Sequence, residues 1–108
     1  MAQESNHIVV LITASSVEEA GAIGRALVEQ RLAACVNISP GVRSLFRWQG
    51  VIEDQAEVLI LAKSRSDLLP SVIEAVKRLH SYTVPEVIAV PILGGSPDYL
   101  AWIDESVR

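Results

Sequence analysis

The sequence is poor in cysteine, histidine and positive charge, and it lacks a long apolar run. With one cysteine among 108 residues, no intrachain disulfide can form, and nothing requires an oxidising compartment. The formal net charge of −4 and the absence of a basic run argue against a nucleic-acid-binding protein. No apolar stretch approaches the roughly 20 residues that a membrane-spanning helix needs. The first residues, MAQESNH, do not read as a signal peptide, so we expect a cytoplasmic protein with no membrane contact.

Half of the residues are hydrophobic, and a chain of 108 residues with this composition can build one compact domain. We expect residues 1–6 to form a flexible tail and residues 7–108 to form a single domain. The run His7–Ala14, HIVVLITA, is continuous and rich in β-branched residues. This composition predicts a first strand that is buried on both faces.

A helical pattern follows this strand over residues 17–30. Ser16 and Glu19 have the spacing of a capping box, in which Ser16 is the N-cap and Glu19 reaches back to it. The stretch Arg31–Ile38, RLAACVNI, then marks the change from helix to strand and holds the lone Cys35.

Two long extended segments come next, over residues 35–49 and 51–64. Pro40-Gly41 predicts a bulge or bend in the first segment, because proline cannot donate to a central ladder. Gln49-Gly50 predicts a tight turn, so the two segments form a hairpin. Basic residues on one arm face acids on the other, and we expect cross-strand pairs of Arg43 and Arg47 with Glu53, Asp54 and Glu57.

The last third of the chain repeats the helix-then-strand order. Ser66 and Asp67 can cap a second helix that ends at His80. Residues 87–93 predict a fourth strand, which the proline at position 91 should confine to a sheet edge. A short helix then begins at Ser96-Pro97-Asp98. The β-α-β-β-α-β order predicts an α+β, ferredoxin-like fold with a long central hairpin and a short C-terminal helix.

The predicted hairpin is too long for its helices. Each helix spans about 21 Å at about 1.5 Å per residue, whereas each hairpin arm spans about 45 Å at about 3.3 Å per residue. No other element can cover the apolar residues of the distal hairpin, which are Leu45, Phe46, Trp48, Val51 and Ile52. Because exposed apolar edge strands promote association, we predict a closed homo-oligomer.

Several spaced motifs resemble the CutA divalent-cation tolerance family, and they run in register from about His7 to Ile103. They are RLAACVNI, SLFRWQG from Ser44, the strand end at Lys63, HSYTVPE from His80, and PDYLAW from Pro97. The resemblance implies a ferredoxin-like subunit, a homotrimer built by the hairpins, and a link to tolerance of copper and other divalent metals. It also implies kinship in architecture with the PII signalling proteins, which bind small effectors between subunits.

Two positions depart from the family pattern. Ser81 stands where the family usually has proline, and Phe46 stands where it usually has tyrosine. The first change removes a restraint on the loop after the second helix. The second removes a hydroxyl from whatever the hairpin lines.

Cys35 and His80 are the candidate metal ligands. A thiolate suits Cu(I), but a cysteine at a strand start is also a common buried, inert residue. His80 at a helix end could equally be a capping residue. One cysteine and two histidines cannot close a tetrahedral site within one chain, so a site would be low-coordinate, assembled between subunits, or adventitious. We expect copper or another divalent metal as ligand, and we expect folding not to require it.

A second hypothesis concerns a cleft between subunits, where a mixture of charged and aromatic side chains could hold a small effector. Its candidate residues are Trp48, Lys63, His80, Tyr82 and Glu86. Plain alternatives exist, because Lys63 also reads as a solvated charge after a buried strand and Trp48 as interface packing.

Catalysis is not indicated. Cys35 and His80 could be drawn as nucleophile and base, but no residue that would orient them is evident. With what the resemblance implies, the leading interpretation is a trimeric protein that binds divalent metal. The alternatives are a PII-like effector sensor and a stable trimeric scaffold.

Overall fold

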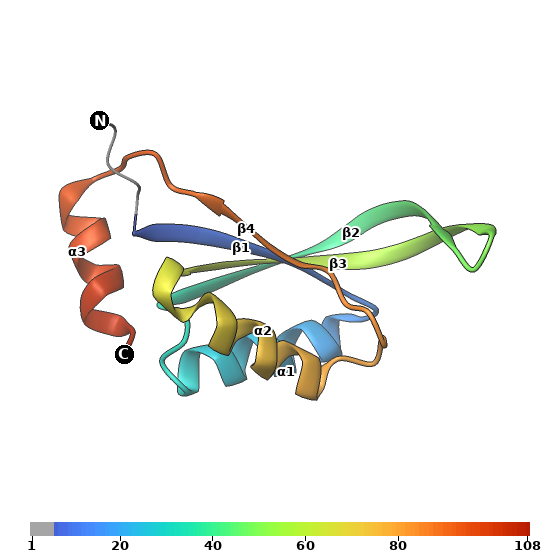
Figure 1. The fold of residues 1–108 in the computed structure, drawn as a ribbon, viewed down its shortest axis with the longest axis horizontal. Coiled ribbons are helices and arrows are strands. Elements are labelled where there is room, and N and C mark those ends of the chain that lie inside the picture. Colours follow the sequence, from blue (N-terminus) through green and yellow to red (C-terminus); the bar gives the residue numbers. More distant parts are fainter. Residues whose placement is uncertain (1–5) are drawn as a thin grey trace.

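The computed structural model describes residues 6–108, so the tail expected over residues 1–6 lies outside the described residues apart from Asn6. The described chain forms one sheet and three helices (Figure 1). In chain order the elements are β1 (His7–Ala14), α1 (Val17–Glu29), β2 (Cys35–Trp48), β3 (Val51–Arg65), the 3-10 turn η1 (Ser66–Leu68), α2 (Leu69–Leu79), β4 (Val87–Pro91) and α3 (Pro97–Ser106).

The sheet confirms the α+β, ferredoxin-like prediction. Its four strands are antiparallel and lie in the order β2-β3-β1-β4. In Figure 1, α1 and α2 lie together below the strands and cover one face of the sheet. β4 lies at the sheet edge, as Pro91 requires, and it ends at that proline instead of continuing to Leu93.

β1 is buried on one face, whereas the continuous apolar run predicted burial on both. Ile8, Val10 and Ile12 face the helices and are buried, while Val9 and Leu11 between them are only half-buried. The reason is that α1 and α2 pack on the same side, so among residues 6–108 neither long helix covers the other side. We call the other side the open face of the sheet.

Of the two predicted helix caps, the one at α1 is present and the one at α2 is absent. The Ser16 hydroxyl accepts the Glu19 N–H at 3.1 Å, as predicted. The Glu19 carboxylate, however, accepts the backbone N–H of Ser15 at 2.9 Å rather than that of Ser16. The second helix begins with η1 and has no side-chain cap, so the expected cap by Ser66 or Asp67 is wrong.

The hairpin confirms the predicted bulge near Gly41 and the predicted tight turn at Gln49-Gly50. The pairing of β2 with β3 slips between Ser39 and Val42, and Gly41 there has a φ of 87°. The turn carries positive φ at both Gln49 (50°) and Gly50 (80°), the dihedral signs of a type I′ turn. The hairpin projects beyond the helices in Figure 1, and the longest dimension of the molecule is 43 Å.

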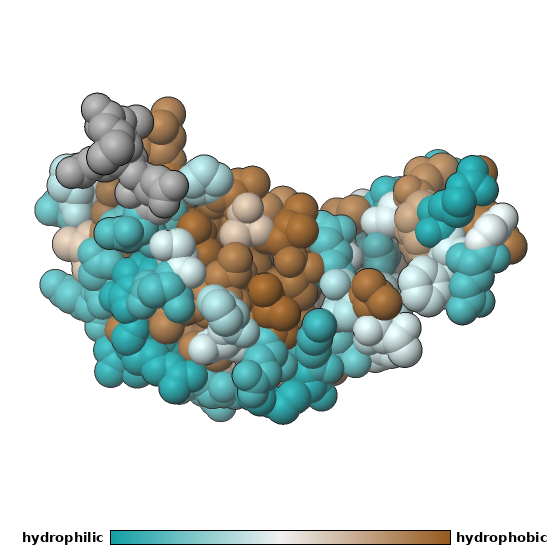
Figure 2. All heavy atoms as spheres, in the orientation of Figure 1, coloured by the Kyte–Doolittle hydropathy of each residue, from teal (hydrophilic) through white to brown (hydrophobic). Residues whose placement is uncertain are grey.

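Apolar side chains remain at the surface in two places. Figure 2 shows them gathered where β1 and β4 run, and again on the projecting hairpin. The exposed large apolar residues of these elements are Leu45, Phe46, Trp48, Val51, Ile52, Ile88 and Val90. Because monomeric proteins rarely leave such residues together on the surface, both regions are candidate contact surfaces.

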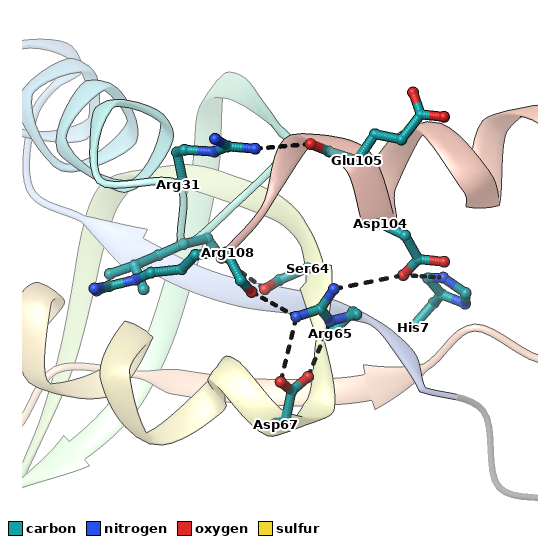
Figure 3. A network of polar contacts seen from close by, with 9 residues as sticks. His7, Arg31, Ser64, Arg65, Asp67, Asp104, Glu105 and Arg108 are labelled. Carbon is teal, nitrogen blue, oxygen red and sulfur yellow. Dashed lines mark hydrogen bonds and ion pairs between the residues drawn. The ribbon is translucent and has the colours of Figure 1, made fainter.

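α3 is held against the sheet end by arginines, as Figure 3 shows. The Arg31 guanidinium donates to the carbonyl oxygens of Glu105 (2.8 Å) and Ser106 (3.1 Å), which are free at the end of this helix. Arg65, the last residue of β3, pairs with Asp104 of α3 at 3.8 Å and donates to the carbonyl oxygen of Arg108 just beyond the helix. These bonds join the C-terminal helix to β3 and to the loop before β2.

Candidate functional site

A cleft lies between the distal hairpin and the segment 81–86 that follows α2. It has a volume of about 800 Å³, and we call it the hairpin cleft. Aromatic and acidic side chains from both sides line it, namely Phe46, Trp48, Glu53, Glu57, Tyr82 and Glu86. Its walls therefore combine apolar rings with carboxylates.

The hairpin wall follows from strand alternation. Phe46 pairs with Glu53 in the register, and Ser44 pairs with Gln55, so all four lie on one face of the ribbon. Arg43 lies on the opposite face and forms an ion pair with Asp54 at 2.6 Å. The cross-strand pairing predicted for Arg43 is thus confirmed with Asp54, while Glu57 bonds elsewhere.

Glu57 is bonded to Tyr82 across the cleft. The Tyr82 hydroxyl donates to the Glu57 carboxylate at 2.7 Å, and Glu57 is 6% exposed. Burial, together with the bond to the Glu57 carboxylate, raises the pKa of Tyr82 to about 12. The pair therefore joins β3 to the segment after α2 as a neutral phenol on a carboxylate.

His80 lies behind the cleft and is buried. Its Nε2 donates to the carbonyl oxygen of Thr13 at 2.6 Å, and its Nδ1 accepts the backbone N–H of Tyr82 at 3.0 Å. This pattern assigns the neutral ring with its proton on Nε2. The His80 ring also contacts the Tyr82 ring at 4.7 Å between centroids. Both ring nitrogens are thus committed to backbone groups.

Glu19 anchors the same segment from α1. Its second carboxylate oxygen accepts the backbone N–H of Ser81 at 2.8 Å. Partial burial opposes ionisation of Glu19, but hydrogen bonds from Ser15 and Ser81 prevail and lower its pKa to about 2. The carboxylate at the helix start therefore fixes the position of the cleft's second wall.

The structure brings together three of the five residues proposed for a cleft. Trp48, Tyr82 and Glu86 line the hairpin cleft, and His80 supports it from behind. Lys63 is elsewhere, on the open face, where its ammonium group donates to the side-chain oxygen of Asn37.

Cys35 and His80 do not share a site in one chain. Cys35 pairs with Lys63, which pairs with Val9 of β1, whereas His80 bonds to Thr13 at the other end of that strand. Four residues of strand separate these levels by about 13 Å. Within residues 6–108, no group of three or more His, Cys, Asp or Glu side chains could hold a metal ion. A site built from Cys35 and His80 of one chain does not fit this geometry.

Cys35 itself is half-buried and close to α3. Burial, and then the neighbouring Cys35 thiol, raise the pKa of the Tyr99 hydroxyl. The thiol thus lies at the end of the open face, beside Tyr99 and Lys63.

Sequence reasoning missed the acidic wall of the cleft. Glu53 and Glu57 were assigned to cross-strand ion pairs, yet both line the cleft. The signal was present, because Glu53, Gln55 and Glu57 recur with the period of two that places them on one face, opposite Ser44 and Phe46. The contact with Tyr82 could not be inferred from that period.

No helix among the described residues is long and apolar enough to cross a membrane. Residues 8–106 match the family model described as CutA1 divalent ion tolerance protein. The chain is 52% identical over 98 residues to the divalent-cation tolerance protein CutA of Thermus thermophilus, a match that covers 91% of this chain and 95% of that protein. It is 44% identical to a chloroplastic CutA of Arabidopsis thaliana, covering 94% of this chain but 56% of that longer protein.

Solved structures agree with these relatives. A divalent cation tolerance protein from Thermus thermophilus superposes with a TM-score of 0.92 at 50% identity, covering 94% of this chain and 99% of that one. A structure from Archaeoglobus fulgidus, described as a periplasmic divalent cation tolerance protein CutA, gives a TM-score of 0.91 at 46% identity over 94% and 99% of the two chains. The matched fold, with its projecting hairpin and the motifs that build it, shows that this chain belongs to the CutA1 divalent ion tolerance family.

Proposed function

We propose that this protein is a homotrimer that contributes to divalent-cation tolerance by binding and not by catalysis. The observation that carries the proposal is the open face of the sheet. Ile88 and Val90 on β4 are 55% and 46% exposed there, next to the half-buried Val9 and Leu11 of β1. Burying apolar area of this kind contributes roughly 25 cal/mol per Å², which favours association.

The hairpin supports the same proposal. Its distal residues lie beyond both helices, and Leu45, Val51 and Ile52 are exposed. A two-stranded ribbon of this length is marginal alone in water, and contact with neighbouring subunits would stabilise it. A closed ring of subunits would also protect the open edge of β2.

Ultracentrifugation at micromolar protein concentration tests the assembly. We expect a trimer for the wild type and a shift toward monomer for Ile88→Glu, which places a charge on the open face. Val17→Glu is the matched control, because Val17 is equally exposed but begins α1 on the other side of the sheet. A monomeric wild type, or equal behaviour of the two variants, would contradict the proposal.

The metal function is proposed at Cys35. A thiolate on a face that we expect to meet other subunits could share a soft cation such as Cu(I) between chains. His80 is the weaker candidate ligand, because binding a metal would require it to release Thr13 or Tyr82. The non-catalytic role is supported by the separation of Cys35 from His80, which leaves the thiol without that base.

Calorimetric titration of the trimer with Cu(I), Cu(II) and Zn(II) tests this. We expect Cys35→Ala to weaken Cu(I) binding about tenfold or more, and His80→Gln to leave it nearly unchanged. Cys35→Ala binding Cu(I) as tightly as the wild type would remove Cys35 from the site. Loss of binding in His80→Gln alone would move the site to His80.

A second function is favoured by the hairpin cleft, which holds Trp48, Tyr82 and Glu86 together. We propose it as the binding site of a PII-like sensor for a small effector. A trimer that binds neither metal nor effector would be a scaffold. The cytoplasmic location expected from the sequence also stands as a proposal, tested by cell fractionation, since named relatives include chloroplastic and periplasmic proteins.

A further inference from the structure

We infer that the hairpin cleft binds a small organic cation, an alkylammonium group held between carboxylates and aromatic rings. The inference deepens the second function above and rests on that use of the cleft as an effector site. It concerns the chemical class of the ligand, which the walls of the cleft determine.

Charge is the first reason. Three glutamates line the cleft, Glu53 and Glu57 from β3 and Glu86 from the opposite wall. The described residues that line it include no lysine, arginine or histidine. The like charges of these three carboxylates add together in the cleft, so an anion that enters is repelled and a cation is attracted.

Glu57 strengthens the preference of the cleft for a cation. Glu57 is 6% exposed, and the side chain that bonds to its carboxylate is the neutral hydroxyl of Tyr82. A buried carboxylate is normally paired with a positive charge, because a neutral donor compensates only part of the lost hydration. An ammonium group in the cleft would supply that positive charge.

The aromatic rings are the second, independent reason. Phe46 and Trp48 are two residues apart on one face of β2, so their Cα atoms lie about 7 Å apart and both side chains belong to the cleft wall. They are 37% and 43% exposed, which leaves ring surface available to a ligand. Cations with attached methyl or methylene groups bind the faces of such rings, most strongly that of tryptophan.

The same observations argue against a bare metal ion in this cleft. No three acidic, histidine or cysteine side chains among residues 6–108 converge as metal ligands require. An alkylammonium ion needs less, because one or two carboxylate acceptors and an apolar contact suffice. The cleft volume of about 800 Å³ accommodates a molecule of several carbon atoms.

Calorimetric titration of the assembled protein with diaminobutane and tetramethylammonium, at low salt, tests the inference. Butanediol and succinate are the neutral and anionic probes of similar size. We expect the two cations to bind and the other two probes not to bind. We also expect the affinity to fall as salt rises, since a charged group is recognised.

Neighbouring acids of one strand provide the matched variants. Glu53→Gln removes a cleft carboxylate, whereas Asp54→Asn removes the next acid, which pairs with Arg43 on the opposite face. We expect Glu53→Gln and Trp48→Leu each to weaken cation binding about tenfold, and Asp54→Asn to change it less than about twofold. Equal losses in Glu53→Gln and Asp54→Asn would overturn the inference.

Sedimentation of each variant is recorded alongside, so that failure of the inference is separable from failure of the assembly. A trimer that binds no cation up to about 10 mM overturns the inference while the homotrimer stands, as it would if a neighbouring hairpin filled the cleft. Binding of butanediol or succinate as tightly as diaminobutane would also overturn it, yet would leave effector binding in place.

Discussion

His80 ties the end of α2 to the end of β1 through Thr13. Its Nε2 donates to the Thr13 carbonyl oxygen at 2.6 Å, although 67 positions separate the two residues. The other ring nitrogen accepts the backbone N–H of Tyr82 and so fixes the start of the segment 81–86, which forms one wall of the cleft. A residue that resembles a metal ligand in the sequence is thus a bridge between two backbone segments.

We expect His80→Ala to lower the free energy of unfolding by about 2–4 kcal/mol. The variant leaves the buried Thr13 carbonyl and the partly buried Tyr82 N–H without their partner, and it opens a cavity beside Tyr82. Denaturant unfolding at one fixed protein concentration measures the effect, since association contributes to apparent stability. Thr83→Ala, an exposed change in the same segment, should lie within about 0.5 kcal/mol of the wild type.

Glu19 should make stability depend on acid. Its pKa is about 2 in the folded chain and 4.5 in the reference state, so its contribution is fully present above pH 4.5. That contribution is lost as the pH falls from about 4.5 through about 2. Glu19→Gln should be about 1 kcal/mol less stable at neutral pH and should lose less stability across this window.

Thermal unfolding between pH 2 and pH 6 measures this difference. Glu18→Gln is the control, because Glu18 is exposed in the same helical turn. Parallel pH profiles for Glu19→Gln and the wild type would show that the bonds to Ser15 and Ser81 do not stabilise the fold.

Two glycines of α1 should respond oppositely to alanine. A Cβ at Gly24 would lie 3.0 Å from Cγ1 of Val36, whereas a Cβ at Gly21 would meet nothing within 4 Å. We expect Gly21→Ala to stabilise by about 0.5–1 kcal/mol through helix propensity. Gly24→Ala should destabilise by about 1–2 kcal/mol, because overlap with β2 outweighs that gain. Chemical denaturation of both variants measures these free-energy differences. A stabilised Gly24→Ala would contradict the prediction, because it would show that Val36 of β2 moves aside at little cost.

Arg31 should control the C-terminal helix. It has a φ of 57°, and its side chain donates to two carbonyl oxygens at the end of α3. Arg31→Gly removes the unfavourable positive φ of a non-glycine residue, but it also removes the two hydrogen bonds to α3. We expect amide hydrogen exchange in α3 to become about tenfold faster, because these bonds are lost. Arg25→Ala, which removes an exposed ion pair with Glu29, should leave α3 exchange unchanged.

Local features could be predicted from the residues because they depend on neighbours in the chain. Ser16 caps α1, Pro91 ends an edge strand, and Gly41 and Gly50 take positive φ at the bulge and the turn. In each case the reason is a dihedral preference or a hydrogen bond within a few residues. Even the acidic cleft wall was encoded in the alternation of Glu53 and Glu57.

Contacts between distant residues could not be predicted in this way. Tyr82 meets Glu57, and His80 is placed behind the cleft rather than beside Cys35, because sheet order and register decide which strand ends are neighbours. The apolar run His7–Ala14 likewise does not reveal whether its second face is covered by the same chain or left open.

The sequence by itself therefore determined the order of the elements, the hairpin turn and bulge, the cap of α1, and the length of the hairpin. Only the tertiary structure decided that one face of β1 stays open and that acids and aromatic rings meet across a cleft. The physical reason is range. Propensity and periodicity act over a few residues, whereas the cleft and the open face result from packing between segments far apart in the chain.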